Sequence, residues 1–82
     1  MNTLFYPAVF HPEKTGYSVY IPDVEGCVSE GDTLEEAYEN IFDALGLCLE
    51  SFRESGKPFP TAANPANMEK ENDDFIVIIP FA

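Results

Sequence analysis

Cys27 is the side chain best suited to nucleophilic chemistry, in the stretch YIPDVEGCVSEGDTLEEA at residues 20–37. A cysteine nucleophile needs a base, usually histidine, and the only histidine is His11, in or beside an expected hairpin loop. Glu25 and Glu30 lie near Cys27 in sequence, and negative neighbours raise a thiol pKa rather than lower it. We therefore expect no catalytic role for Cys27 and no enzymatic activity.

Acidic residues on both sides of Cys27 could in principle bind a hard cation or serve a two-metal nuclease: Asp23, Glu25, Glu30 and Asp32. Their spacing is not that of a calcium loop. One histidine with two scattered cysteines also lacks the spacing of a zinc site. Solvated acids are the simpler interpretation. We therefore expect no metal and no cofactor, and keep a metal-dependent nuclease as an alternative function.

Net charge is the strongest compositional signal: 15 acids face 4 Lys and Arg in 82 residues, for a net charge of -11. Such a surface repels phosphates, so we expect no direct nucleic-acid binding by this chain. It attracts a basic protein instead, and acidity that merely maintains solubility is the alternative. No apolar stretch is long enough to span a membrane, and the N-terminus does not resemble a signal peptide. We expect a cytoplasmic protein with free thiols.

Three strands are predicted before the first helix, over residues 3–10, 17–22 and 27–30. Pro7 indicates an edge position or an irregularity in the first of them. In the second, Tyr17, Val19 and Ile21 share one face, while Ser18 and Tyr20 share the other. The run FIVIIPF at residues 75–81 predicts a last strand that is buried on both faces.

A long helix is predicted from Thr33, which forms a capping box with Glu36, to about Ser55, where Gly56 can end it. Its predicted apolar stripe faces the sheet and contains Leu34, Ala37, Tyr38, Ile41, Ala44, Leu45, Cys48 and Phe52. The other face is acidic. The result is an α+β fold of order β-β-β-α-β, with one helix on one face of a mostly antiparallel sheet.

Small size favours a homo-oligomer, most simply a dimer, since so short a chain has little core of its own. Phe42 and Leu49 lie at the margin of the apolar stripe, where they either widen the core or meet another chain. Ile76 and Ile78 of the last strand are the other candidate interface residues. Residues 57–74 form a long polar connection that we expect to be partly mobile.

Residues 17–50 resemble the N-terminal, toxin-binding domain of the HicB family of antitoxins. The family pattern P-D-x-x-G-C-x-(T/S)-x-G-D-T-x-E-E-A-x-x-N is matched by Pro22, Asp23, Gly26, Cys27, Ser29, Gly31, Asp32, Thr33, Glu35, Glu36, Ala37 and Asn40. With the leading strand, the resemblance covers about residues 3–60. It implies a fold similar to a shortened ribonuclease H fold without its active site.

The resemblance implies an antitoxin that binds and neutralises HicA, a small mRNA-cleaving ribonuclease. A basic toxin is also the partner that an acidic surface would attract. Family members usually carry a C-terminal DNA-binding domain, and we expect one domain over residues 1–82 without it. The candidate toxin-binding residues are Asp23, Glu25, Glu30, Asp32, Glu39 and Asp43. A stand-alone acidic ligand-binding or assembly module is the other alternative.

Overall fold

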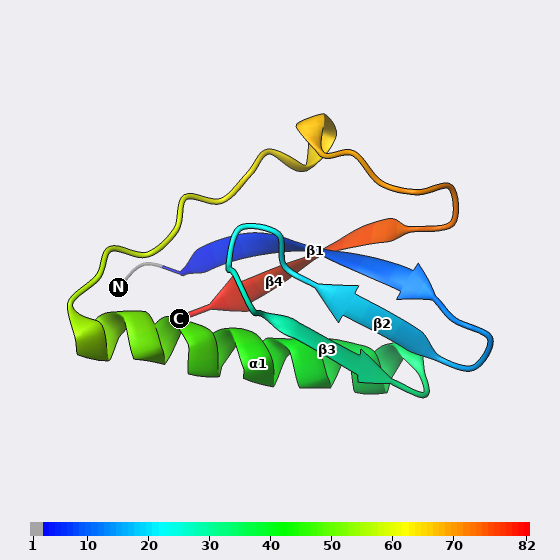
Figure 1. Cartoon of the computed structure of the whole chain (residues 1–82), viewed down its shortest axis with the longest axis horizontal. Helices are drawn as coiled ribbons and strands as arrows, with labels where there is room; N and C mark the ends of the chain where they lie inside the picture. The colour runs from blue at the N-terminus through cyan, green and yellow to red at the C-terminus, as the bar shows by residue number, and fades with distance from the viewer. Residues whose placement is uncertain (1–2) are drawn as a thin grey trace.

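The chain forms a four-stranded antiparallel sheet with one long helix along one face, as expected from the sequence (Figure 1). The computed structural model describes residues 3–82. Its elements, in chain order, are β1 (Leu4–Pro12), β2 (Tyr17–Tyr20), β3 (Val28–Gly31), α1 (Leu34–Ser55), a short 3-10 helix (Pro65–Asn67) and β4 (Phe75–Phe81). The predicted order β-β-β-α-β is confirmed.

The sheet has the strand order β3-β2-β1-β4, so β1 is a central strand, but Pro7 lies in its first half, which has the local edge position that the sequence predicts. The strand tolerates this proline because β2 pairs only with Val9–Pro12, whereas β4 pairs along Leu4–Phe10. Pro7 therefore has a paired neighbour on one side only. The missing N–H of Pro7 therefore does not fall at a position that is paired with strands on both sides.

Strand β4 lies at the edge of the sheet, and the exposure of its residues shows that the expected burial of both faces is wrong. Only Ile79 is fully buried, and Ile78 on the opposite face is 42% exposed. Because a continuous apolar run shows no alternation, it cannot reveal that one face of the strand lacks a cover. The outer backbone edge of β4 has no neighbouring strand in the described sheet.

The core lies between α1 and the sheet face formed by alternate residues of β1 and β2, including Tyr6, Ala8, Phe10 and Val19. From the helix it takes residues four apart: Ala37, Ile41, Leu45 and Leu49. Leu34, expected in this stripe, is 41% exposed because it belongs to the first turn of α1. Within residues 3–82, no helix has the length and hydropathy needed to cross a membrane.

Both ends of α1 follow the sequence prediction. Thr33 Oγ1 accepts a hydrogen bond from the Glu36 N–H at 3.1 Å, and Glu36 Oε1 accepts one from the Asp32 N–H at 2.6 Å. Gly56 adopts the left-handed conformation with φ 72°, which lets its N–H reach back to the last turn. These caps satisfy backbone groups that a helix cannot pair internally.

The connection between α1 and β4 runs past β1 on the side away from the helix (Figure 1). It is attached near its start, where Phe59 packs edge-on against Phe81 and the Pro60 carbonyl accepts a 2.6 Å hydrogen bond from the Tyr6 hydroxyl. The side chain of Val9 points to this side of the sheet and is fully buried. Mobility of the connection stays a prediction.

Candidate functional site

A group of acids surrounds the junction between β3 and the start of α1. Glu30 and Asp32 line a hollow of about 710 Å³ together with Glu13, Glu36 and Asn40. All of these side chains are exposed. Asp32 and Glu36 also form a hydrogen bond that caps the helix, so part of the charge here has a structural role. The hollow offers carboxylates and an amide to a basic partner.

Glu39 and Asp43 are exposed on α1, one turn apart, next to the first hollow. They line a second hollow of about 490 Å³ with the stacked rings of Tyr38 and Phe42. Partly exposed aromatic rings are enriched in surfaces that bind another protein, and polar groups form the rim of such surfaces. The structure therefore brings four of the six predicted acids to neighbouring parts of one surface.

The other two acids lie in the turn between β2 and β3. Asp23 Oδ2 accepts a hydrogen bond from the Ala63 N–H at 2.8 Å, which fastens the connection to this turn. Glu25 is exposed in the same turn. The spacing in sequence does not reveal this division, because Gly26 and the strand β3 direct the chain away from Asp23.

Cys27 is buried in the core, so the structure supports a packing role rather than a nucleophilic one. Burial, together with a smaller effect of the neighbouring Cys48, raises the pKa of the Cys27 thiol to about 12. A thiol with so high a pKa is almost entirely protonated at neutral pH. His11 lies elsewhere, on β1, where it pairs with Ser18 of β2.

Of the residues predicted to form an oligomer interface, some lie in the core and others on the surface. Leu49 is fully buried in the core, which corrects its assignment to an interface and supports the alternative that it widens the core face. Phe42 is 45% exposed on α1. Ile76 and Ile78 share the face of β4 that points away from the helix.

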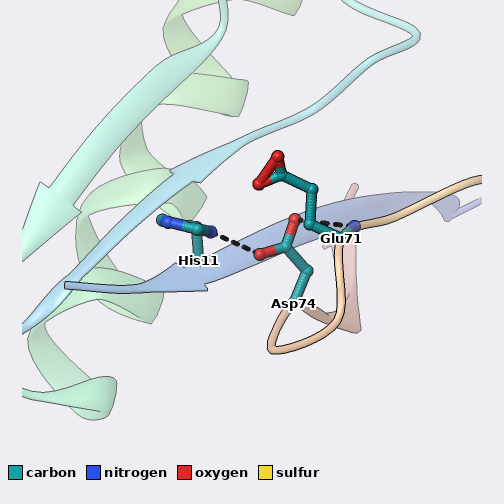
Figure 2. Close-up of side chains that lie close together, drawn as sticks. All are labelled: His11, Glu71 and Asp74. Atoms are coloured by element: carbon teal, nitrogen blue, oxygen red, sulfur yellow. Dashed lines mark hydrogen bonds and ion pairs between the residues drawn. The ribbon is translucent and has the colours of Figure 1, made fainter.

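One cluster was not expected from the sequence: His11 near the end of β1 meets Glu71 and Asp74 in the turn that precedes β4 (Figure 2). His11 Nδ1 and Asp74 Oδ1 are 2.5 Å apart. This hydrogen bond to Asp74 raises the pKa of His11 above its ordinary value. No local spacing could have shown the cluster, because it depends on the pairing of β1 with β4.

A protein-family model described as the HicB-like antitoxin of bacterial toxin-antitoxin systems matches residues 6–80. The chain belongs to this family. The match covers every strand and the helix, apart from the outermost residues of β1 and β4. The HicB resemblance seen in the sequence is confirmed.

Two curated relatives are similar to this chain, and one of them is named as a HicB antitoxin. The chain is 37% identical over 79 residues to an uncharacterised 14.9 kDa protein of Haemophilus phage HP1, covering 93% of this chain and 59% of the phage protein. It is 39% identical over 61 residues to Antitoxin HicB 1 of Photorhabdus laumondii, covering 73% of this chain and 39% of that antitoxin. The chain thus spans less than two thirds of the length of each relative.

A solved structure of a HicA3 and HicB3 toxin-antitoxin complex contains a chain with the same fold. The TM-score is 0.73 at 21% sequence identity, with 93% of this chain and 95% of that chain covered.

Several residues of the HicB motif hold α1 against the sheet. Gly31 lies so close to α1 that a Cβ on it would be 2.3 Å from the Ala37 backbone nitrogen. Asn40 Nδ2 donates a 2.7 Å hydrogen bond to the Glu30 carbonyl and so ties α1 to β3. Together with the Thr33 cap, these contacts hold the helix against the sheet. Much of the motif therefore maintains the fold that presents the acidic surface.

Proposed function

We propose that the chain is the toxin-binding part of a type II antitoxin and neutralises a HicA-type mRNA-cleaving ribonuclease. The observation that carries the proposal is the HicB-like family match over residues 6–80. The name of the HicA3 and HicB3 complex supports a HicA-type partner. The free thiols of Cys27 and Cys48 suit a reducing cytoplasm, where mRNA would be exposed to the toxin.

The acidic surface supports a basic partner. Glu30, Asp32, Glu39 and Asp43 lie on neighbouring parts of β3 and α1, in a chain whose net charge is -11. A toxin that cleaves RNA must bind phosphates, so basic side chains are expected at its active site. Complementary charge speeds the encounter of two proteins and favours this partner over acidic ones.

A non-enzymatic role fits the side chains near the motif. The Cys27 thiol is buried and its pKa is raised to about 12, which opposes nucleophilic attack. The alternative of a nuclease needs the acids of residues 23–32 to converge on a metal. Among residues 3–82, these acids form no cluster of potential ligand atoms within 4.8 Å of one another.

The proposal is tested by co-expression with a HicA-type protein, the first candidate being any small basic protein encoded next to this chain, followed by purification through a tag on the partner. We expect a stable complex whose association slows as ionic strength rises, because salt screens the acidic surface. If the two folded proteins do not associate at low ionic strength, the antitoxin proposal is wrong. If their association rate does not depend on salt, electrostatic steering is wrong.

We also propose that the chain assembles into a homo-oligomer through the exposed edge strand β4. Ile78 is 42% exposed on β4, whose outer edge lacks a described neighbour. A long apolar edge strand without a charged residue favours pairing with another chain. An interface at Phe42 of α1, which lines a hollow together with Pro80 and Phe81 at the end of β4, is the competing arrangement.

We expect Ile78→Asp to convert the oligomer into a folded monomer, because pairing two copies would bury the added carboxylate twice. Val28→Asp is the matched control, since Val28 is an exposed apolar residue on the opposite edge strand β3. Light scattering measures the mass, and circular dichroism confirms the fold. Dissociation by Phe42→Asp alone would assign the interface to α1. A wild-type monomer at high concentration would exclude the oligomer.

A further inference from the structure

His11, Glu71 and Asp74 come from opposite ends of the chain and meet at one point on the surface (Figure 2). Each offers one potential ligand atom, and these three atoms lie within 4.8 Å of one another. Within residues 3–82, no other group of three or more histidine, cysteine or acidic side chains meets this condition. The antitoxin function proposed above does not use this cluster.

The carboxylate of Asp74 is held in a fixed position. Its side chain is only 7% exposed, and its Oδ1 faces His11 Nδ1 at 2.5 Å. Its Oδ2 accepts a 3.4 Å hydrogen bond from the Glu71 N–H, while the Asp74 N–H donates to the Glu71 carbonyl at 3.0 Å. The turn that contains both acids is therefore closed on itself. A buried carboxylate is stabilised by a positive partner, which here is protonated His11 or a cation in its place.

The open side of the cluster has room for water. Next to it lies a hollow of about 520 Å³, lined by the three residues together with Ser18, Tyr20, Glu69 and Lys70. Lys70 opposes a bound cation, but Glu69, Glu71 and Asp74 outnumber it. An ion held by three protein side chains would complete its coordination with water from this hollow.

We propose that His11, Glu71 and Asp74 form a binding site for one divalent transition-metal ion of the zinc type. An imidazole nitrogen with two carboxylates is a donor set that suits zinc better than magnesium or calcium, which prefer oxygen ligands alone. Zinc would replace the proton between His11 and Asp74.

The required movements are small. Ligand atoms on a tetrahedral zinc ion are roughly 3.4 Å apart, since each bond is about 2.1 Å long. His11 Nδ1 and Asp74 Oδ1 must therefore separate from 2.5 Å, while the Glu71 carboxylate moves inward from within 4.8 Å. The bound ion would join the end of β1 to the start of β4. Because so small a domain has little core, such a link would raise its thermal stability.

This proposal departs from the expectation of no metal, which rested on spacing along the sequence. His11 is the only histidine. Glu71 and Asp74 lie in the polar connection of residues 57–74, for which the sequence predicts no contact with the strands. The antiparallel pairing of Phe10 with Phe75 brings the neighbouring residues together.

Calorimetric titration of the full chain with zinc chloride tests the site. We expect one ion per chain and a higher melting temperature when zinc is present. Glu71→Gln should lower the affinity by roughly 100-fold or more, because loss of a ligand exceeds the 10–100-fold effect of losing an outer-shell partner. Glu69→Gln is the matched control, since it removes the same charge from the same hollow but lies outside the cluster.

Cobalt as a probe identifies the ligands. We expect weak visible bands from nitrogen and oxygen ligands in the wild-type chain and their loss in folded His11→Ala. Strong near-ultraviolet thiolate bands would assign the ion to Cys27 or Cys48 and overturn the proposal. The absence of zinc binding would also overturn the proposal. Equal loss of affinity in Glu71→Gln and Glu69→Gln would overturn it as well, because it would indicate diffuse charge attraction.

Discussion

Gly31→Ala is expected to unfold a large part of the chain. The new Cβ would lie 2.3 Å from the Ala37 backbone nitrogen, 2.7 Å from the Ala37 Cα and 2.8 Å from the Glu36 carbonyl carbon. All three are backbone atoms, so no side chain can move aside. The start of α1 would have to leave the sheet, which costs about 3 kcal/mol or more. That is comparable with the roughly 3–5 kcal/mol expected from a single core of this size.

Gly46→Ala is the matched control for this prediction. Gly46 lies in the interior of α1, and a Cβ there would meet nothing within 4 Å. Alanine is a better helix former than glycine by about 1 kcal/mol, so this variant should be slightly more stable than the wild type. Urea unfolding followed by circular dichroism measures both changes. A Gly31→Ala midpoint equal to that of the wild type would contradict the close contact between β3 and α1.

Local patterns in the sequence predicted the parts of the fold that depend on neighbouring residues. The alternation of Tyr17, Val19 and Ile21 correctly assigned the core face of β2. Thr33, Glu36 and Gly56 correctly marked the ends of α1. Capping and alternation are determined by residues within a few positions of one another, so a single sequence reveals them.

Features that depend on pairing between distant segments could not be predicted. The apolar composition of β4 is the same whether it is central or at an edge, so the exposure of Ile78 was missed. Asp23 looked like part of one acidic group, but a hydrogen bond from the distant Ala63 N–H gives it a structural role. The cluster of His11 with Asp74 likewise exists only after β1 and β4 have paired.

The paired charge reversal Glu39→Lys with Asp43→Lys is expected to slow toxin binding by about tenfold or more at low ionic strength. Both acids are exposed on α1 beside Phe42, and neither has a role in the helix cap. The variant should therefore stay folded while replacing attraction with repulsion where we propose the toxin binds. Surface plasmon resonance measures the association rate at several salt concentrations.

Glu50→Lys with Glu54→Lys is the matched control on the same helix. These acids are also exposed and four residues apart, so the net charge changes equally. The ion pair of Glu50 with Arg53, at 2.9 Å, is exposed and contributes little to stability. We expect a much smaller loss of association rate. Equal losses in the two variants would show that total charge, rather than the surface at residues 30–43, directs the encounter.

Inhibition of RNA cleavage tests the central claim most directly. The purified toxin is mixed with a labelled RNA, and this chain is added in increasing amounts while the cleavage rate is followed. We expect cleavage to fall to the background rate once the chain is present in about equal amount to the toxin, as for a tight complex. Unchanged cleavage at a large excess of folded chain would contradict the assignment of this chain as the toxin-neutralising part of an antitoxin.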